Sequence, residues 1–247
     1  MKLTAIISDA YKYSGSNPEH KNTNRKRWLI FGLMMFTTYV VIPGIFVAGY
    51  ALRVTRKTVH GDSEMPEFNE WLSMFVDGLK VIAVSIIYYL VPAIIVILGA
   101  GQYYLVADVY GISDISLIYW PLLIIGVLLF IPFLMLYMMA IANMASHNRF
   151  TAAFSMSEMG QRIRTIGYGR FILWWLATMI VSAIFASAGQ FIEMTSSIVG
   201  FFVVPILIKS FITLFQFRSI GLIYQEGSNT EKNSDEPVIE GKSIVNE

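Results

Sequence analysis

The sequence predicts an all-α protein: a polytopic helical membrane bundle with five hydrophobic segments and two cytoplasmic interfacial amphipathic helices. Of its 247 residues, 55% are hydrophobic and only 14% are charged, whereas a soluble domain has about a quarter charged residues. The charged residues also avoid several long stretches, each long enough to supply the roughly 20 apolar residues that cross a bilayer. A soluble helical core is disfavoured, because its helices would alternate polar and apolar faces.

Five segments contain most of the apolar residues. Their approximate bounds are residues 28–52, 81–107, 117–142, 171–192 and 198–217. The first four contain no Asp, Glu, Lys or Arg, and the fifth contains only Lys209. They divide the chain into an amphipathic and basic N-terminal part (1–27), a helical membrane domain (28–224) and an acidic tail (225–247), whose polar composition predicts disorder.

The first segment, residues 28–52, has two interpretations. Residues 1–27 carry six Lys and Arg, which favours the cytoplasmic side by the positive-inside rule. The basic connector after the segment favours the same side, yet a single span would separate the two. We expect a single span; the alternative is a re-entrant hairpin that folds back near Pro43 and Gly44.

The connector at residues 53–80 is expected to contain a loop from Arg53 to Met65 and then an amphipathic helix. Its large apolar residues recur at helical spacing: Phe68, Trp71, Leu72, Phe75 and Leu79. Glu67, Glu70 and Asp77 take the opposite side of this helix. We expect the apolar side to rest in the interface or on the bundle, and the acidic side to be solvated.

The connector at residues 143–170 repeats this arrangement. Ser155 and Glu158 have the spacing of a capping box at a helix start. Apolar residues then line one side of the helix: Met156, Met159, Ile163 and Ile166. We expect both connector helices to be solvated on their charged sides. The alternative is ion pairing between them, with Glu67, Glu70 or Asp77 joined to Arg162 or Arg164.

Basic residues orient the remaining segments. The connectors 53–80 and 143–170 carry four Lys and Arg each, whereas residues 102–114 and 190–197 carry none. The positive-inside rule places both long connectors and the C-terminus in the cytoplasm. The sequence thus predicts a multi-pass protein of the cell membrane.

One run of the chain resembles a known family. The run begins at Gly49-Tyr50 and continues through Arg53, Arg56, Gly61, Pro66-Glu67-Phe68, Trp71 and Phe75 to Asp77-Gly78-Leu79-Lys80. Asn143 and Thr151-Ala152-Ala153-Phe154 fit as well, and the likeness covers most of residues 29–224. The pattern is similar to that of an uncharacterised family of prokaryotic, notably archaeal, membrane proteins with a domain of unknown function. The resemblance implies a multi-span membrane protein, and it implies no activity, cofactor or catalytic residue.

Composition and motifs give no indication of a metal site, a cofactor site or a catalytic site. The chain has no Cys and three His, which lie in unrelated segments without metal-ligand spacing, so we expect no metal and no cofactor. The apolar runs contain no His, no GxSxG motif and no pair of Asp, so no catalytic residue is predicted. We expect a non-catalytic protein that organises the membrane or binds a lipid or partner. The alternatives are a transporter or channel for a small or lipidic solute, and an intramembrane or interfacial enzyme acting on lipid.

Six residues are candidates for binding: Lys209, Asn143, Arg53, Arg56, Trp71 and Asp77. Lys209 lies about 13 Å from the inner interface if its segment is a straight helix. Its side chain either snorkels to the headgroups or faces a polar pocket beside Asn143 or Gln216.

The expected partners are membrane lipids. A second copy of the chain is a further candidate, because the fourth segment carries a surface of small residues that allows close helix packing: Ser182, Ala183, Ala186, Ser187 and Gly189. The net charge of +1 gives no reason to expect nucleic acid.

The predicted orientation can be tested with single cysteines, since the chain has none of its own. Cysteines at Ser63 and Ser157 should be protected from an impermeant thiol reagent applied to intact cells, whereas one at Ser113 should react. Equal labelling at all three positions would contradict the orientation. A cysteine at Ser16 distinguishes the two forms of the first segment, because a single span exposes it outside.

Overall fold

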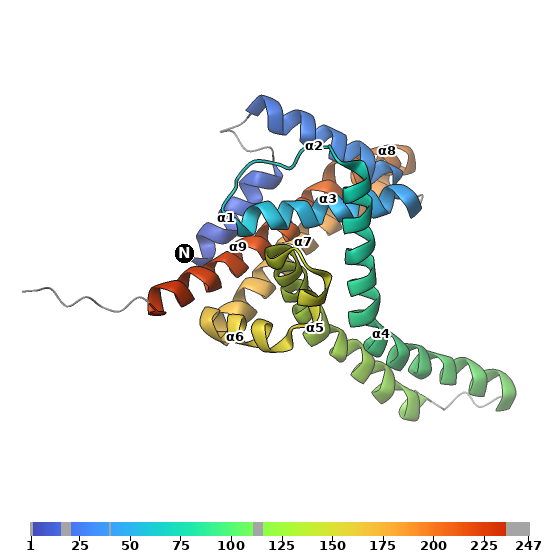
Figure 1. Cartoon of the computed structure of the whole chain (residues 1–247). Helices are drawn as coiled ribbons and strands as arrows, with labels where there is room; N and C mark the ends of the chain where they lie inside the picture. Colours follow the sequence, from blue (N-terminus) through green and yellow to red (C-terminus); the bar gives the residue numbers. More distant parts are fainter. Residues whose placement is uncertain (1, 16–20, 40, 111–115, 236–247) are drawn as a thin grey trace, which may run out of the picture.

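The computed structural model describes residues 2–15, 21–39, 41–110 and 116–235, which are almost wholly helical (Figure 1). Its α-helices are α1 (Leu3–Ser14), α2 (Lys21–Phe36), α3 (Val41–Val59), α4 (Trp71–Tyr110), α5 (Ser116–His147), α6 (Met156–Ile166), α7 (Tyr168–Thr195), α8 (Ser197–Val203) and α9 (Ser210–Asp235). Two 3₁₀ turns, η2 (Thr37–Tyr39) and η3 (Phe150–Phe154), precede α3 and α6. A π-helical stretch, η4 (Val204–Lys209), joins α8 to α9.

Within the part of the chain that the structure describes, four stretches are long and apolar enough to cross a membrane: Trp71–Ala100, Leu123–His147, Tyr168–Thr195 and Ser197–Asn229. They overlap the second and third predicted segments and contain the fourth and fifth. Many of their large side chains point outward, and Ile97, Ile180 and Ile184 are each at least 60% exposed. An apolar surface of this extent needs a non-aqueous environment. The structure therefore fits a multi-pass integral membrane protein with four candidate spans, and the prediction of five was wrong.

The first hydrophobic segment is a helical hairpin rather than one helix. The η2 turn interrupts it, and α2 and α3 run in opposite directions (Figure 1). At the open end, Arg27 on α2 donates a hydrogen bond to the backbone oxygen of Met65, in the loop that follows α3. The start of α2 and the end of α3 thus lie at the same end of the hairpin, as in the re-entrant alternative.

The connector 53–80 also differs from the prediction. Helix α3 continues to Val59, and α4 begins at Trp71 and runs unbroken into the second segment. No proline lies between Trp71 and Val81 to end the helix. The predicted interfacial helix is therefore the first part of a longer one. The expectation that Asp77 is solvated was wrong, because it is only 3% exposed. Trp71 and Leu72 are 50% and 77% exposed, which is compatible with a place in the interface. The second connector helix is separate, as predicted, and forms α6.

Helix α3 lies at the centre of the fold, in contact with α4, α5 and α9. Its crossing with α4 brings the two backbones together at Gly49 and Gly78. A Cβ atom on Gly49 would lie 1.9 Å from the Met74 backbone oxygen, and one on Gly78 would lie 1.9 Å from that of Ile45. Only glycine permits this approach, which explains the type of both residues.

Helix α9 extends further than the sequence indicated. It continues to Asp235, although we placed the end of the membrane domain at Tyr224. Glu226 is buried and forms an ion pair with Arg170 at the start of α7, so the first part of the predicted tail belongs to the helical fold. Residues 236–247 lie outside the described residues.

The charged parts of the chain gather at one end of the molecule, which we call the polar end. It comprises α1, the loop 60–70, α6 and residues 218–226 of α9. Arg218 joins α9 to α1 through Asp9 and to the loop through the backbone oxygen of Asp62. Tyr224 bonds to Asn143 near the end of α5. The N-terminal helix, both basic connectors and the second half of α9 therefore lie together.

The glycine crossing can be tested by Gly49→Ala. Alanine favours an isolated helix by about 1 kcal/mol over glycine, but here the methyl group would force α3 away from α4. Overpacking of this kind costs about 1–3 kcal/mol, so the unfolding temperature in detergent should fall. Gly44→Ala is the matched control on α3, because its Cβ would meet only the Thr38 oxygen, at 4.0 Å. Equal unfolding temperatures for the two variants would contradict the tight crossing.

Candidate functional site

The residues that carry the family resemblance form a corner between α3 and α4. Arg53 is 8% exposed, and its guanidinium donates to the backbone oxygens of Asn69 (2.8 Å) and Glu70 (3.0 Å). The Tyr50 hydroxyl donates to the Pro66 oxygen at 3.0 Å, and its ring stacks on Phe68 with centroids 4.4 Å apart. These contacts hold the loop 60–70 against α3 just before α4 begins.

Asp77 neutralises the basic side of this corner. Its carboxylate accepts from Arg56 at 3.0 Å and from Lys80 at 3.3 Å. The sequence prediction placed Asp77 in water, but its side chain is only 5% exposed. The cause is its neighbour Gly78, whose contact with α3 turns this side of α4 inward. Arg53, Arg56 and Asp77 therefore lie near each other, as part of the structural corner.

The other acids of this region pair with α2 and α3. Glu67 binds Arg27 at 2.7 Å, and Glu70 lies 4.0 Å from Arg53. Neither pairs with Arg162 or Arg164, the alternative that the sequence left open. Partial burial would raise the pKa of Asp62, but hydrogen bonds from Lys57 and from the backbone N–H of Glu64 outweigh burial and lower it.

A cavity of about 360 Å³ opens beside the corner. Its lining is charged or polar apart from Pro66: Arg53, Arg56, Lys57, Pro66, Glu67, Asn69, Glu70 and Ser73. Its cations already have partners in the protein, since Arg53 and Arg56 bind the groups described above and Lys57 binds Asp62 at 2.7 Å. This cavity therefore offers little uncompensated charge to a ligand.

The remaining candidates lie elsewhere. Trp71 is half exposed and meets the edge of Phe46. Asn143 is buried at the polar end, where it binds Glu158 and Tyr224. The exposed Lys209 places its amine 5.6 Å from the Tyr39 ring centre at the tip of the α2–α3 hairpin. Asn143 is thus engaged away from Lys209, and Gln216 donates to Ser182.

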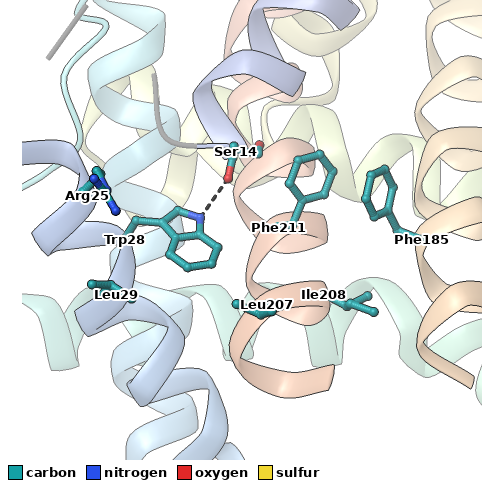
Figure 2. Close-up of a pocket in the computed structure, with 9 residues that line it drawn as sticks. Ser14, Arg25, Trp28, Leu29, Phe185, Leu207, Ile208 and Phe211 are labelled. Atoms are coloured by element: carbon teal, nitrogen blue, oxygen red, sulfur yellow. Dashed lines mark hydrogen bonds between the residues drawn. The ribbon is translucent and has the colours of Figure 1, made fainter. Parts of the chain in front are cut away.

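A cavity of about 440 Å³, which the sequence did not indicate, lies between α1, α2, α7 and the η4–α9 segment (Figure 2). We call it the amphipathic cavity. Its lining is Ser14, Gly15, Arg25, Trp28, Leu29, Phe185, Leu207, Ile208 and Phe211. Figure 2 shows Arg25 and Leu29 one turn apart on α2 with Trp28 beside them, and Leu207, Ile208, Phe211 and Phe185 further across the cavity.

Local contacts fix the shape of the amphipathic cavity. Trp28 donates its indole N–H to the Ser14 backbone oxygen at 2.8 Å, which joins α2 to the end of α1. Phe185 and Phe211 stack with ring centres 4.2 Å apart and form the opposite wall. Leu207 and Ile208 belong to the π-helical η4, a geometry that often marks functional sites. Arg25 is exposed and is the one charged residue among the lining residues that the structure describes.

No group of His, Cys, Asp or Glu in the described ranges has an arrangement that could hold a metal ion.

The small-residue surface of α7 divides in two. Ser182 and Gly189 are buried, and a Cβ on Gly189 would meet Val204 at 3.3 Å. Ala183, Ala186 and Ser187 remain exposed. Part of the surface proposed for oligomerisation is thus used within the chain.

Comparison with known protein families shows which family the chain belongs to. A family model described as "Protein of unknown function (DUF4013)" matches residues 32–194, and the chain belongs to this family. The matched region contains the α3–α4 corner and Asn143, whereas most of the amphipathic cavity lies outside it. Searches of curated proteins and of solved structures gave no match.

The structural role of Asp77 predicts a loss of stability for Asp77→Asn. The change removes the buried counter-charge of Arg56 and Lys80. Breaking a fully buried pair costs about 3–5 kcal/mol. The Arg56 and Lys80 side chains are 25% and 32% exposed, so water screens them in part and the cost should be smaller, but the variant should still unfold at a lower temperature in detergent. Glu67→Gln is the control, since Glu67 is 61% exposed and exposed pairs contribute at most about 1 kcal/mol. A stable Asp77→Asn protein would show that the corner does not depend on this charge.

Proposed function

We propose that this protein binds an anionic membrane phospholipid in the amphipathic cavity, and that it organises the membrane around it without catalysing a reaction. A phospholipid has a charged phosphate at one end and apolar acyl chains at the other. The cavity has the same division, with Arg25 at one side and aliphatic and aromatic side chains along the rest. This match in polarity is the observation that carries the proposal.

The position of the cavity supports a lipid rather than a soluble ligand. Leu29 and Leu207 line it and are 53% and 45% exposed, so it opens onto the apolar surface of the bundle. An acyl chain can enter there from the bilayer without crossing water. The guanidinium of Arg25 suits a phosphate, because it donates several hydrogen bonds in a fixed planar geometry.

We place the polar end in the cytoplasm, because it gathers the basic N-terminal part and both basic connectors. Arg25 then lies toward the inner leaflet, where anionic headgroups attract basic residues. The transport alternative depended on Lys209, and the exposed position of that residue over Tyr39 gives it no support.

Arg25→Gln tests the headgroup contact, with Lys26→Gln as the matched control. Both residues are exposed cations on α2, but only Arg25 lines the cavity. Purified protein in nanodiscs of phosphatidylcholine with a minor share of phosphatidylglycerol should retain phosphatidylglycerol in native mass spectrometry. Arg25→Gln should reduce that retention severalfold, since charge-assisted hydrogen bonds to phosphate are lost, whereas Lys26→Gln should not.

Leu29→Trp tests the apolar part of the same site. The larger side chain narrows the cavity and should displace any bound phospholipid, whatever its headgroup. Leu33→Trp, one turn along α2 and similarly exposed at 59%, lies outside the lining and should change nothing. If Leu29→Trp and Arg25→Gln both retain lipid as the unaltered chain does, the proposed site is wrong.

A further inference from the structure

A second, smaller cavity of about 180 Å³ lies at the polar end between α5, α6 and α9. Its lining is polar throughout: Asn143, His147, Glu158, Gln161, Arg162 and Tyr224. Typical pockets for larger organic ligands have volumes of about 300–1,000 Å³. The size and lining of this cavity therefore suit a small polar molecule, in contrast to the amphipathic cavity.

The back wall of this polar cavity is rigid. Asn143 and Tyr224 are 1% and 2% exposed, and the Tyr224 hydroxyl donates to the Asn143 side-chain oxygen at 2.6 Å. The Asn143 amide donates to the Ala152 backbone oxygen at 2.8 Å and to a Glu158 carboxylate oxygen at 3.0 Å. Three helices and the η3 turn are thus joined at one buried amide.

Opposite charges line this cavity without being joined to each other. Glu158 and Arg162 are four residues apart on α6, a spacing at which Glu and Arg commonly form an ion pair. Here Asn143 holds Glu158, while the Arg162 guanidinium lies over the Tyr224 ring, 4.9 Å from its centre. Within the described part of the chain, no ion pair joins the two. The carboxylate and the guanidinium thus line the same cavity while each contacts a different neighbour.

We propose that this polar cavity binds a small zwitterion: a primary ammonium linked through a few bonds to a phosphate or carboxylate. The ammonium would lie against Glu158 and the anionic group against Arg162. This chemistry belongs both to free molecules such as phosphoethanolamine and to the headgroup of phosphatidylethanolamine. The proposal is independent of the lipid site, since the two cavities have no lining residue in common.

Isothermal titration of the full chain in neutral detergent with O-phosphoethanolamine tests the free form. Native mass spectrometry in nanodiscs of mixed phosphatidylethanolamine and phosphatidylcholine tests the headgroup form, because a quaternary ammonium cannot donate hydrogen bonds to Glu158. Binding in the first assay alone identifies a free ligand, and selective retention of phosphatidylethanolamine identifies the lipid. Either result supports the site only if the variants below reduce it; absence of both overturns the proposal.

Glu158→Gln removes the charge but keeps an oxygen that accepts from Asn143, so the fold should survive. It should weaken the observed binding about tenfold or more, and Arg162→Gln should do the same. Arg164→Gln is the control on α6, since Arg164 is exposed and outside the lining. Unfolding temperatures close to that of the unaltered chain would confirm that the variants fold. Binding that is equal in the unaltered chain, Glu158→Gln and Arg162→Gln would show that the cavity is not the site.

Discussion

The arrangement of the polar end depends on one buried cation, Arg218 of α9. Its side chain is 6% exposed, and its guanidinium donates to Asp9 (2.9 Å), Thr58 (3.1 Å) and the backbone oxygen of Asp62 (2.7 Å). The group also lies over the Tyr13 ring, 4.7 Å from its centre. An unpaired charge in this place would cost several kcal/mol. The N-terminal helix, the end of α3 and the loop after it must therefore meet at α9 for the chain to fold.

This requirement explains both the hairpin and the amphipathic cavity. Because α1 and the end of α3 meet the same guanidinium, the apolar stretch between them has to leave the polar end and return to it. Asp9 also fixes α1 in position, so that Ser14 at its C-terminal end reaches Trp28 and closes one side of the cavity. The cavity is thus a consequence of how the charged groups are satisfied, and its apolar lining is what remains between α2, α7 and η4.

The sequence predicted the features that depend on local composition. The four candidate spans followed from long apolar runs with at most one charged residue each, and α6 followed from its spacing of apolar residues. The prediction failed where a distant partner decided the outcome. Asp77 looked solvated from the helical pattern, but Gly78 brings α3 against that side of α4. The amphipathic cavity could not be predicted at all, because its lining comes from segments as far apart as Ser14 and Phe211, and no local pattern links them.

The charged residues of this chain have two different roles: those at the α3–α4 corner stabilise the fold, and those in the amphipathic and polar cavities are proposed to bind ligands. At the α3–α4 corner the charges that looked functional are compensated within the protein, as Asp77 is by Arg56. The other two cavities each have an exposed charged residue in their lining: Arg25 in the amphipathic cavity and Glu158 in the polar cavity. Both cavities border α9, at Phe211 and Tyr224, about 20 Å apart along the helix. Arg218 lies between these two residues and holds α9 in place, so neither cavity can widen by a shift of α9 without disturbing the hydrogen bonds that assemble the polar end.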